Sequence, residues 1–341
     1  MGKIMRYSLR RLNISTILLF WAALAILSGC SESNQNLSNE PHAAQVPAHK
    51  TADIRYTQYP LAYVQEGELF FHSAVDDKKV KFVEESAAIF NFTFDTAGQT
   101  LYYSVERDNT LWLKSADISA AEVTPQWVVD WQLKKDDCIT ATYAEASPLL
   151  YSQGTLLIQH DFSWDYYGFK SMAIYSIAKN TVNHKEYDQS VIDSYSGELA
   201  FDKVDQYFQT RNQQLYYTGN KAPVSLTDSL DFSALRLKGN EDFKVDTDFT
   251  AFIFAPDKTK ILFAIMLEFG DLAHGPYCIA NANGSQQMLL KDTDIASSRK
   301  PVWLKNNSVA FIDNDENLFV ANNDESTIVK VAENISSFVA R

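Results

Sequence analysis

Two segments of the sequence gather side chains that could recognise a ligand or move a proton. They read HDFSWDYYGF (160–169) and LEFGDLAHGPY (267–277), and both are longer than the polar turns elsewhere in the chain. Carboxylates, imidazoles and aromatic rings together suit ligand or peptide recognition, and a histidine beside a carboxylate also suits acid–base chemistry. The candidate ligand-binding residues are His160, Asp161, Trp164, Asp165, Tyr166, Glu268, Asp271 and His274.

The sequence leaves open what these two segments do. They form a binding face, or their aromatic rings pack over one another while the charges face water. In an enzyme, His160 or His274 would act as the base, with Asp161, Glu268 or Asp271 as the acid or metal ligand. Geometry discriminates between these alternatives, because a histidine and a carboxylate brought within about 3 Å across an open pocket would favour the enzyme.

Known catalytic motifs are mostly missing. The sequence has no Gly-x-Ser-x-Gly elbow, no His-Glu-x-x-His and no phosphate-binding glycine-rich loop. The stretch DNDEN (313–317) lacks the glycine and the distal glutamate of a calcium loop, so we interpret it as a solvated turn. We therefore expect a protein with no cofactor and no metal site, whose role is binding and not catalysis.

The N-terminus predicts export. Four basic residues precede an apolar run, ILLFWAALAIL (17–27), which is too short to span a bilayer as a helix but suits a signal peptide. The sequence LSGC that ends at Cys30 resembles the bacterial lipobox, which implies cleavage before Cys30 and acylation of that residue. Ser31 follows, and Gram-negative sorting rules then imply the outer membrane. The alternative is an uncleaved anchor with an incidental cysteine.

A polar segment follows the lipobox. Residues 31–52 are rich in Ser, Asn, Ala, Gln and Pro, with no aromatic residue. Such a segment buries too little apolar surface to offset the entropy of ordering, so we expect a flexible tether. The predicted organisation is a signal peptide (1–29), a lipidated cysteine with its linker (30–54) and a folded domain (55–341).

The net charge of the chain limits the classes of partner that it can bind. The net charge is −13, and removing a signal peptide with four basic and no acidic residues takes it to −17. An acidic body argues against nucleic acid, which requires contacts from Lys and Arg to phosphate. It also argues against lying flat on anionic lipid. We expect membrane attachment through the N-terminal lipid alone, and a protein or glycan partner in the envelope.

Two further cysteines, Cys138 and Cys278, lie in the folded domain. An oxidising compartment permits a disulfide between them, and the alternative is two separate buried thiols. No Cys-x-x-Cys occurs, so a redox or zinc site has no support.

The folded domain repeats one pattern. An apolar strand meets a tight polar turn, a strand of large residues follows, and further strands come after a loop, as in FAPDKTKILFAI (254–265). About six copies of near 47 residues are recognisable, and a period of this length with four strands is typical of propeller blades. The copies span residues 61–83, 92–118, 147–182, 204–228, 254–290 and 301–331.

The repeat resembles the TolB-type, WD-like propeller repeat. Matching stretches are FAPDKTKILFA, PVWLKNNSVAF, LFVAN, NANGS and SLTD, and Lys258 stands where that family has a turn glycine. The resemblance implies an all-β propeller of about six four-stranded blades, with five to seven compatible with the repeats. In such a propeller the two segments above share one face, at the mouth of the central channel.

These observations predict a lipid-anchored propeller of the outer membrane that binds a protein, peptide or glycan. The alternative is an enzyme at the propeller mouth, such as a glycan lyase or hydrolase.

Overall fold

The structure, a computed structural model, describes residues 55–73, 78–128, 131–139, 147–163, 168–230, 247–269, 272–295 and 299–341. The chain divides into two units, Met1–Gln45 and Val46–Arg341, and all of the described residues belong to the second. The predicted signal peptide, Cys30 and the predicted linker therefore lie outside the described residues.

The described residues form six antiparallel sheets, and each of the six sequence repeats falls in a different sheet. Sheet 1 contains, in order, β25 (Ile335–Ala340), β1 (Leu61–Gln65), β2 (Glu68–His72) and β3 (Lys79–Lys81). Sheet 2 contains β4 (Ile89–Phe94), β5 (Thr100–Arg107), β6 (Thr110–Asp117) and β7 (Gln126–Trp127), with β8 (Leu133–Lys134) also on β6. Sheet 3 contains β9 (Leu150–Ser152), β10 (Thr155–Ser163), β11 (Gly168–Ser176) and β12 (Thr181–Glu186).

The remaining sheets follow in chain order. Sheet 4 has three described strands, β13 (Phe208–Arg211), β14 (Gln214–Tyr217) and β15 (Val224–Ser225). Sheet 5 contains β16 (Thr247–Phe254), β17 (Lys260–Phe269), β19 (Tyr277–Asn281) and β20 (Met288–Leu289), with β18 (Leu272–His274) also on β17. Sheet 6 contains β21 (Val302–Trp303), β22 (Val309–Ile312), β23 (Leu318–Asn322) and β24 (Thr327–Ala332).

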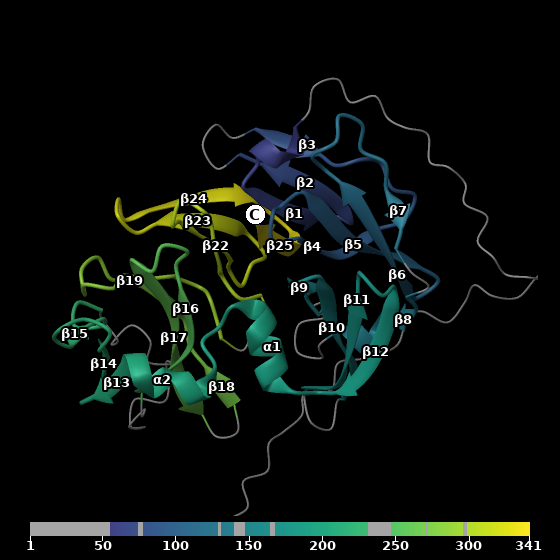
Figure 1. The fold of residues 1–341 in the computed structure, drawn as a ribbon. Coiled ribbons are helices and arrows are strands. Elements are labelled where there is room, and N and C mark those ends of the chain that lie inside the picture. The colour runs from purple at the N-terminus through teal and green to yellow at the C-terminus, as the bar shows by residue number, and fades with distance from the viewer. Residues whose placement is uncertain are drawn as a thin grey trace, which may run out of the picture. The chain divides into compact units, whose positions relative to one another are not determined.

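Helices are short and lie in the connections. The 3₁₀ turns are η1 (Tyr56–Gln58) and η2 (Asp136–Cys138), and the α-helices are α1 (Gln189–Ser196) and α2 (Phe201–Tyr207). Asp188 caps the N-terminus of α1, because its side chain accepts a hydrogen bond from the Ser190 amide. It ends at Gly197 in the left-handed conformation that helix C-termini favour. Figure 1 shows α1 between sheet 3 and the strands of sheet 5.

Neighbouring sheets share hydrophobic cores. One core joins sheet 1 to sheet 2 through Phe71 and Phe92, and another joins sheet 2 to sheet 3 through Leu113 and Leu156. Further cores join sheet 4 to sheet 5, sheet 5 to sheet 6, and sheet 6 back to sheet 1. Sheets 1, 2, 5 and 6 therefore each share cores with two neighbouring sheets, sheet 3 packs on sheet 2 and on α1, and sheet 4 packs on sheet 5. The strand pairing and these cores together define a β-propeller.

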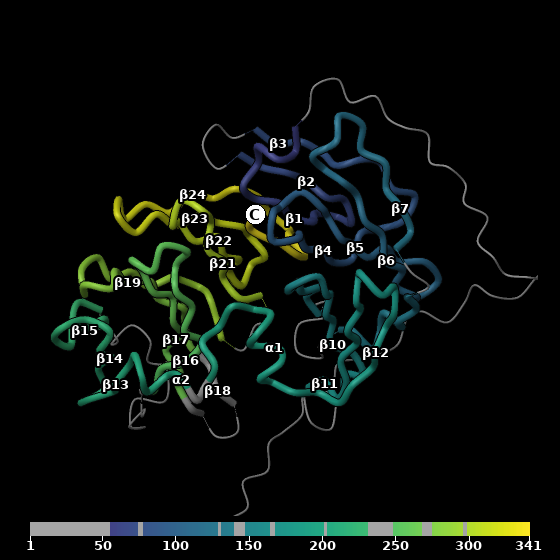
Figure 2. The backbone as a smooth tube through the Cα atoms, in the orientation of Figure 1, coloured from purple at the N-terminus to yellow at the C-terminus, as the bar shows by residue number. Residues whose placement is uncertain are grey.

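The fourth position differs from the others. Ile192 of α1 packs on Leu157 and Met172 of sheet 3, while Leu199 donates its amide to Phe252 O and packs into the core of sheets 4 and 5. A helical segment thus bridges sheets 3 and 5 where the other repeats place a first strand, and the tube in Figure 2 follows this path. The repeat pattern predicts four strands here, and the described residues contain three strands preceded by helices. The blade number of about six stays a prediction.

The two ends of the domain meet in sheet 1. Strand β25, at the C-terminus, pairs antiparallel with β1, and Leu61 lies opposite Ala340. Arg341 extends this contact, because its amide donates to Pro60 O at 2.9 Å and its guanidinium donates to Tyr56 O and Thr57 O. The repeat at 61–83 supplies three strands, and the C-terminus supplies the fourth. This pairing closes the ring and leaves no unpaired edge between the ends.

The repeat stretch FAPDKTKILFAI (254–265) forms a turn that recurs. Asp257 accepts hydrogen bonds from the amide and hydroxyl of Thr259, and Lys258 adopts φ +60°. Equivalent turns place Gly98, Asn307 and Glu316 in the same left-handed conformation. Glycine adopts this conformation without strain and lysine does not, so Lys258 carries a local conformational cost.

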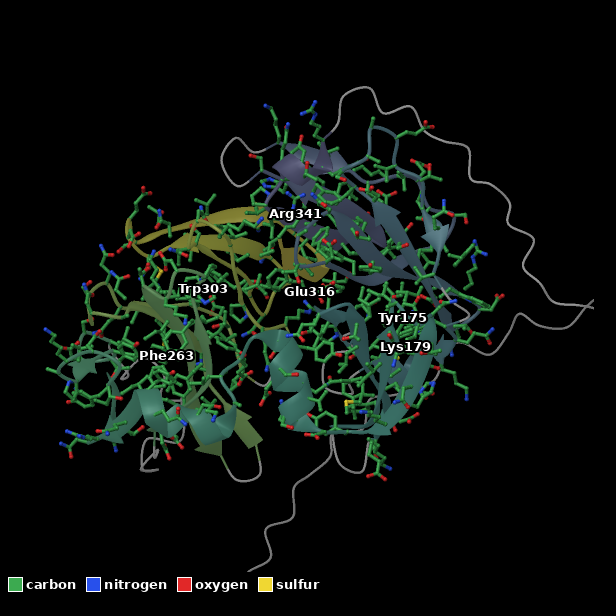
Figure 3. The ribbon with its side chains drawn as sticks, in the orientation of Figure 1. Tyr175, Lys179, Phe263, Trp303, Glu316 and Arg341 are labelled. Atoms are coloured by element: carbon green, nitrogen blue, oxygen red, sulfur yellow. The ribbon has the colours of Figure 1, made fainter. Side chains whose placement is uncertain are left out.

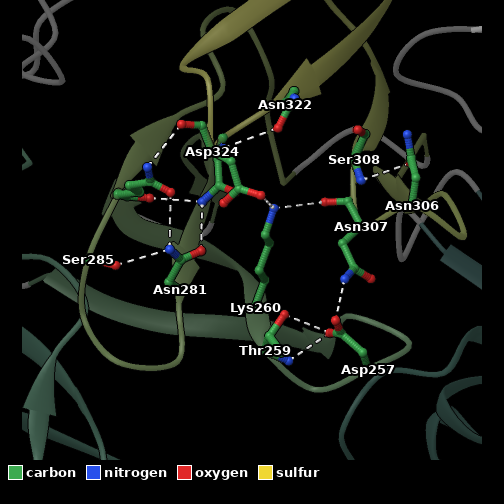
Figure 4. Close-up of polar contacts among 12 residues, drawn as sticks. Asp257, Thr259, Lys260, Asn281, Ser285, Asn306, Asn307, Ser308, Asn322 and Asp324 are labelled. Carbon is green, nitrogen blue, oxygen red and sulfur yellow. Dashed lines mark hydrogen bonds and ion pairs between the residues drawn. The ribbon is translucent and has the colours of Figure 1, made fainter. Parts of the chain in front are cut away.

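Turns of sheets 5 and 6 interlock through a buried lysine. The Lys260 ammonium lies 3.0 Å from Asp324 Oδ2 and 3.3 Å from Asn307 O, and Asn307 donates to Asp257 (Figure 4). Asn323 is buried and donates to Gln286 O across the same junction. The lysine is satisfied by groups of the neighbouring sheet, so these contacts fix how the two sheets are stacked.

We predict that the closing strand is a major source of stability. Phe338 is buried in the core between sheets 6 and 1, so Phe338→Ala should lower the free energy of unfolding by about 3–5 kcal/mol. Val329 on the outer strand β24 is 60% exposed, and Val329→Ala should change it by no more than about 0.5 kcal/mol. Urea denaturation measures both values, and equal effects would contradict the closure.

A second prediction concerns the repeated turn. Lys258→Gly should raise the free energy of unfolding by about 0.5–1 kcal/mol, because glycine relieves the left-handed conformation of residue 258. Lys258→Ala removes the same side chain without that relief and should not stabilise the protein. If both variants raise the free energy of unfolding, the cause is the loss of the Lys258 charge and not relief of the backbone conformation.

Candidate functional site

The structure describes only part of the site expected from the sequence. Trp164, Asp165, Tyr166 and Asp271 lie outside the described residues. Glu268 lies in β17 and His274 in β18, where the backbone of Leu267 faces that of His274. His160 and Asp161 lie within β10 and not in a loop, because the strand continues to Ser163. The structure thus shortens the predicted loop, and the role of these residues stays a prediction.

His160 belongs to a polar cluster of sheet 3. Its Nε2 lies 3.2 Å from Nδ1 of His184 on β12, and the two rings meet edge to face. Its Nδ1 lies 3.1 Å from Asp161 Oδ2. The ring of His160 is buried, whereas His184 is exposed. No sequence pattern predicts the pairing of these histidines, which are 24 residues apart and meet because β10, β11 and β12 are neighbours.

Asp161 is held as a carboxylate within this cluster. A hydrogen bond from the Ser171 side chain lowers the pKa of Asp161, and the nearby His160 and His184 lower it further. Its backbone adopts φ +58° inside a strand, a conformation that Asp tolerates better than most residues. This His–Asp pair lies within one strand, so it does not form the arrangement across a pocket that the enzyme hypothesis requires.

Both cysteines of the folded domain are free and buried. Cys138 packs in the core between sheets 2 and 3, and Cys278 packs in the core of sheets 4 and 5. The disulfide prediction is therefore wrong, and the alternative of two separate buried thiols is confirmed. Burial raises the pKa of Cys138 to about 12, with Asp137 and Asp161 adding to the effect, and burial also raises the pKa of Cys278.

A cavity of about 390 Å³ lies where the first strands of the sheets converge. Its described lining comes mainly from β4, β9, β16, β21 and β25, which begin sheets 2, 3, 5, 6 and 1, and from α1, with further residues from β10 and the connections. The cavity therefore lies on the axis of the ring, and α1 takes the place that a first strand of sheet 4 would occupy. Its volume is in the range of small-molecule sites.

The walls of this axial cavity are mainly apolar, with polar groups at defined points. The apolar and aromatic lining residues include Phe92, Tyr151, Ile192, Tyr195, Ile253, Val302 and Phe338. The uncharged polar ones include Thr93, Gln159, Gln189, Ser336 and Ser337. Tyr195 shares a 2.6 Å hydrogen bond with Thr155, and Tyr187 donates to Gln189, so the rings around α1 are held in place.

The ionised residues of the described lining are Arg299 and Lys300. Arg299 donates to Glu316 at 3.1 Å and to Ile335 O at 3.2 Å, and Lys300 donates to Glu198 at 2.6 Å. Glu198 and Glu316 contact these cations from outside the described lining. Figure 3 labels Glu316, whose backbone carbonyl oxygen accepts a hydrogen bond from the Ile335 amide at the start of β25.

Sequence reasoning missed the axial cavity. Its lining residues are scattered from Phe92 to Val339 and share no spacing. One local signal was available, because Asp188 and Gly197 bracket residues 189–196 as a capping aspartate and a terminal glycine do for a helix. This helix, α1, forms one wall of the axial cavity.

Among the residues that the structure describes, no group of three or more His, Cys, Asp or Glu side chains could hold a metal ion. In the same residues, no helix is long and apolar enough to cross a membrane.

No protein-family model and no curated protein matches the sequence. Similar solved structures include TolB from Acinetobacter baumannii, with 12% identity and a TM-score of 0.44 over 82% of this chain and 66% of that one. The chain thus spans just under two thirds of that TolB chain. A nidogen/laminin complex is also similar, with 9% identity and a TM-score of 0.41 over 82% of this chain and 96% of that one. Apo AztD from Citrobacter koseri is similar with 11% identity and a TM-score of 0.35 over 82% of this chain and 97% of that one. The propeller fold rests on the strand pairing, because these scores are low.

The burial of the two thiols gives a direct prediction. In a Cys30→Ser variant, Cys138 and Cys278 should not react with Ellman's reagent at pH 8, because the reactive thiolate is suppressed in the folded protein. Guanidinium without reductant should expose two reactive thiols. Prompt reaction of the folded protein, or no thiol after unfolding, would contradict the free buried state.

Proposed function

We propose that this protein is a lipid-anchored propeller of the cell envelope that binds a protein, peptide or glycan without transforming it. The observation that carries the proposal is the axial cavity, which gathers residues from five sheets and α1 at one place. Rigid sheets hold its walls, and connections between sheets supply residues such as Tyr187 and Lys300. Functional residues on connections held by a rigid scaffold are a common arrangement.

The chemistry of the cavity supports binding. Aromatic rings, hydroxyls and amides on mainly apolar walls are the usual composition of a ligand site. The His160–Asp161 pair, which the enzyme alternative would use, is contained in sheet 3 and does not belong to the described lining. A partner would insert a side chain, a chain end or a sugar ring into the cavity and rest the remainder on the surrounding connections.

The sequence of the N-terminus supports the anchoring part of the proposal. The basic start, the apolar run and the LSGC sequence lead to acylation of Cys30, and Ser31 favours the outer membrane. Several acyl chains hold a protein on a bilayer firmly, since each buried methylene contributes about 0.8 kcal/mol. The linker of residues 31–54 would then let the propeller reach partners away from the lipid.

Site-specific photo-crosslinking in cells tests this proposal. A benzoylphenylalanine at position 189, on the cavity lining, should crosslink to a defined envelope component, whereas one at the exposed position 329 should not. Cys30→Ser should abolish palmitate labelling and release the protein from the membrane fraction. Identical crosslinks from both positions would contradict binding at the cavity, and membrane retention of the unlabelled variant would contradict the anchor.

A further inference from the structure

We infer that the axial cavity accepts an amphiphilic anion, with an apolar body along the cavity walls and one anionic group at Lys300. This inference rests on the proposed function, because it takes the cavity as a ligand site, and it adds the chemical class of the group that enters. A carboxylate, sulfonate or phosphate attached to an aromatic or aliphatic body has this chemistry.

The first argument is charge. The chain carries a net charge of −13, yet the ionised residues of the described cavity lining, Arg299 and Lys300, are both cations and adjacent in sequence. Their carboxylate partners, Glu198 and Glu316, approach from outside that lining. An anion inside the cavity would therefore lie nearest to Arg299 and Lys300 and not to Glu198 or Glu316. Their attraction would be strong there, because the surrounding protein weakens screening by water.

The second argument is the hydrogen-bonding capacity of Lys300. An ammonium group has three donors, and among the described residues Lys300 donates one hydrogen bond, to Glu198. The Lys300 side chain is 36% exposed, so its ammonium group remains accessible to an incoming group. The Arg299 side chain is less exposed than that of Lys300, and it is already bonded to Glu316 and Ile335 O. Arg299 therefore contributes positive electrostatic potential beside Lys300 and not a direct hydrogen bond to the ligand.

The third argument is the shape and polarity of the remaining wall. Phe92, Ile253, Val302 and Phe338 line the cavity and would bury an apolar body. Ser336 and Ser337 of β25 follow the strand start at Ile335, whose carbonyl oxygen receives Arg299. The Ser336 hydroxyl donates to Val64 O at 3.4 Å, so the Ser337 hydroxyl of the same lining would supply a hydrogen-bond donor for anion oxygens. The lining thus combines one charged end with an apolar remainder.

Glu198 provides a second way to test the inference, because its carboxylate would compete with a ligand anion for Lys300. Removing the charge of Glu198 should release Lys300 and strengthen anion binding, whereas removing the charge of Lys300 should weaken it. A merely structural ion pair predicts something different, because both variants would then affect binding in the same direction by loosening the same contact.

The test uses two probes of matched shape, 2-naphthoate and the uncharged 2-naphthamide, titrated by calorimetry into the full chain in zwitterionic nanodiscs. Lys300→Gln should weaken 2-naphthoate binding by about tenfold or more, and Glu198→Gln should strengthen it by about threefold. Binding of 2-naphthamide should change little in either variant. Lys291→Gln, which removes an exposed lysine outside the lining, is the matched control and should leave both probes unchanged.

Location is tested with Gln189→Trp, which should block both probes by filling the cavity beside α1. Equal affinities for the two probes, unchanged by the charge variants, would overturn the anion inference while leaving a cavity that binds ligands. Binding that survives Gln189→Trp, or no binding of either probe to the wild type, would also overturn it. Crosslinking from position 189 reports separately on the proposed function, so the two failures are distinguishable.

Discussion

The pairing of β25 with β1 is the interaction on which the rest of the structure depends. It joins the two ends of the domain in one sheet, so the core between sheets 6 and 1 and the core between sheets 1 and 2 both need it. The same strand lines the axial cavity through Ser336, Ser337 and Phe338. Closure and site formation are therefore one event, and a chain with β25 detached would lose part of the cavity wall.

Helix α1 occupies the position in the propeller where the fourth repeat departs from the four-stranded pattern. The fourth repeat gives three described strands, and α1 contacts sheet 3 while Leu199 reaches sheet 5. An eight-residue helix is wider than a strand and presents Ile192, Tyr195 and Ser196 to the axis. The irregular repeat thus narrows the axial space to a small-molecule size and gives it a wall chemistry that five regular strands alone would not supply.

The sequence predicts the scaffold well because strand alternation and turns are local signals. FAPDKTKILFAI predicts β16, the turn at Lys258 and β17, and Phe263, one of the large residues of this stretch, is buried. The site is harder to predict, because the pairing of His160 with His184 and of Lys300 with Glu198 depends on strands and connections meeting in space. Spacing along the chain carries no trace of those contacts, and no sequence rule separates a disulfide from two thiols placed in different cores.

Hydrogen exchange of the closing strand tests the central claim most directly. If β25 is an integral part of sheet 1, amides of residues 61–65 and 335–340 should exchange together, at the slow rate set by global unfolding and shared with the core strand β17. Exchange of the 335–340 amides orders of magnitude faster than those of β17 would show that the C-terminus only rests on the domain, and would contradict a ring closed by this strand.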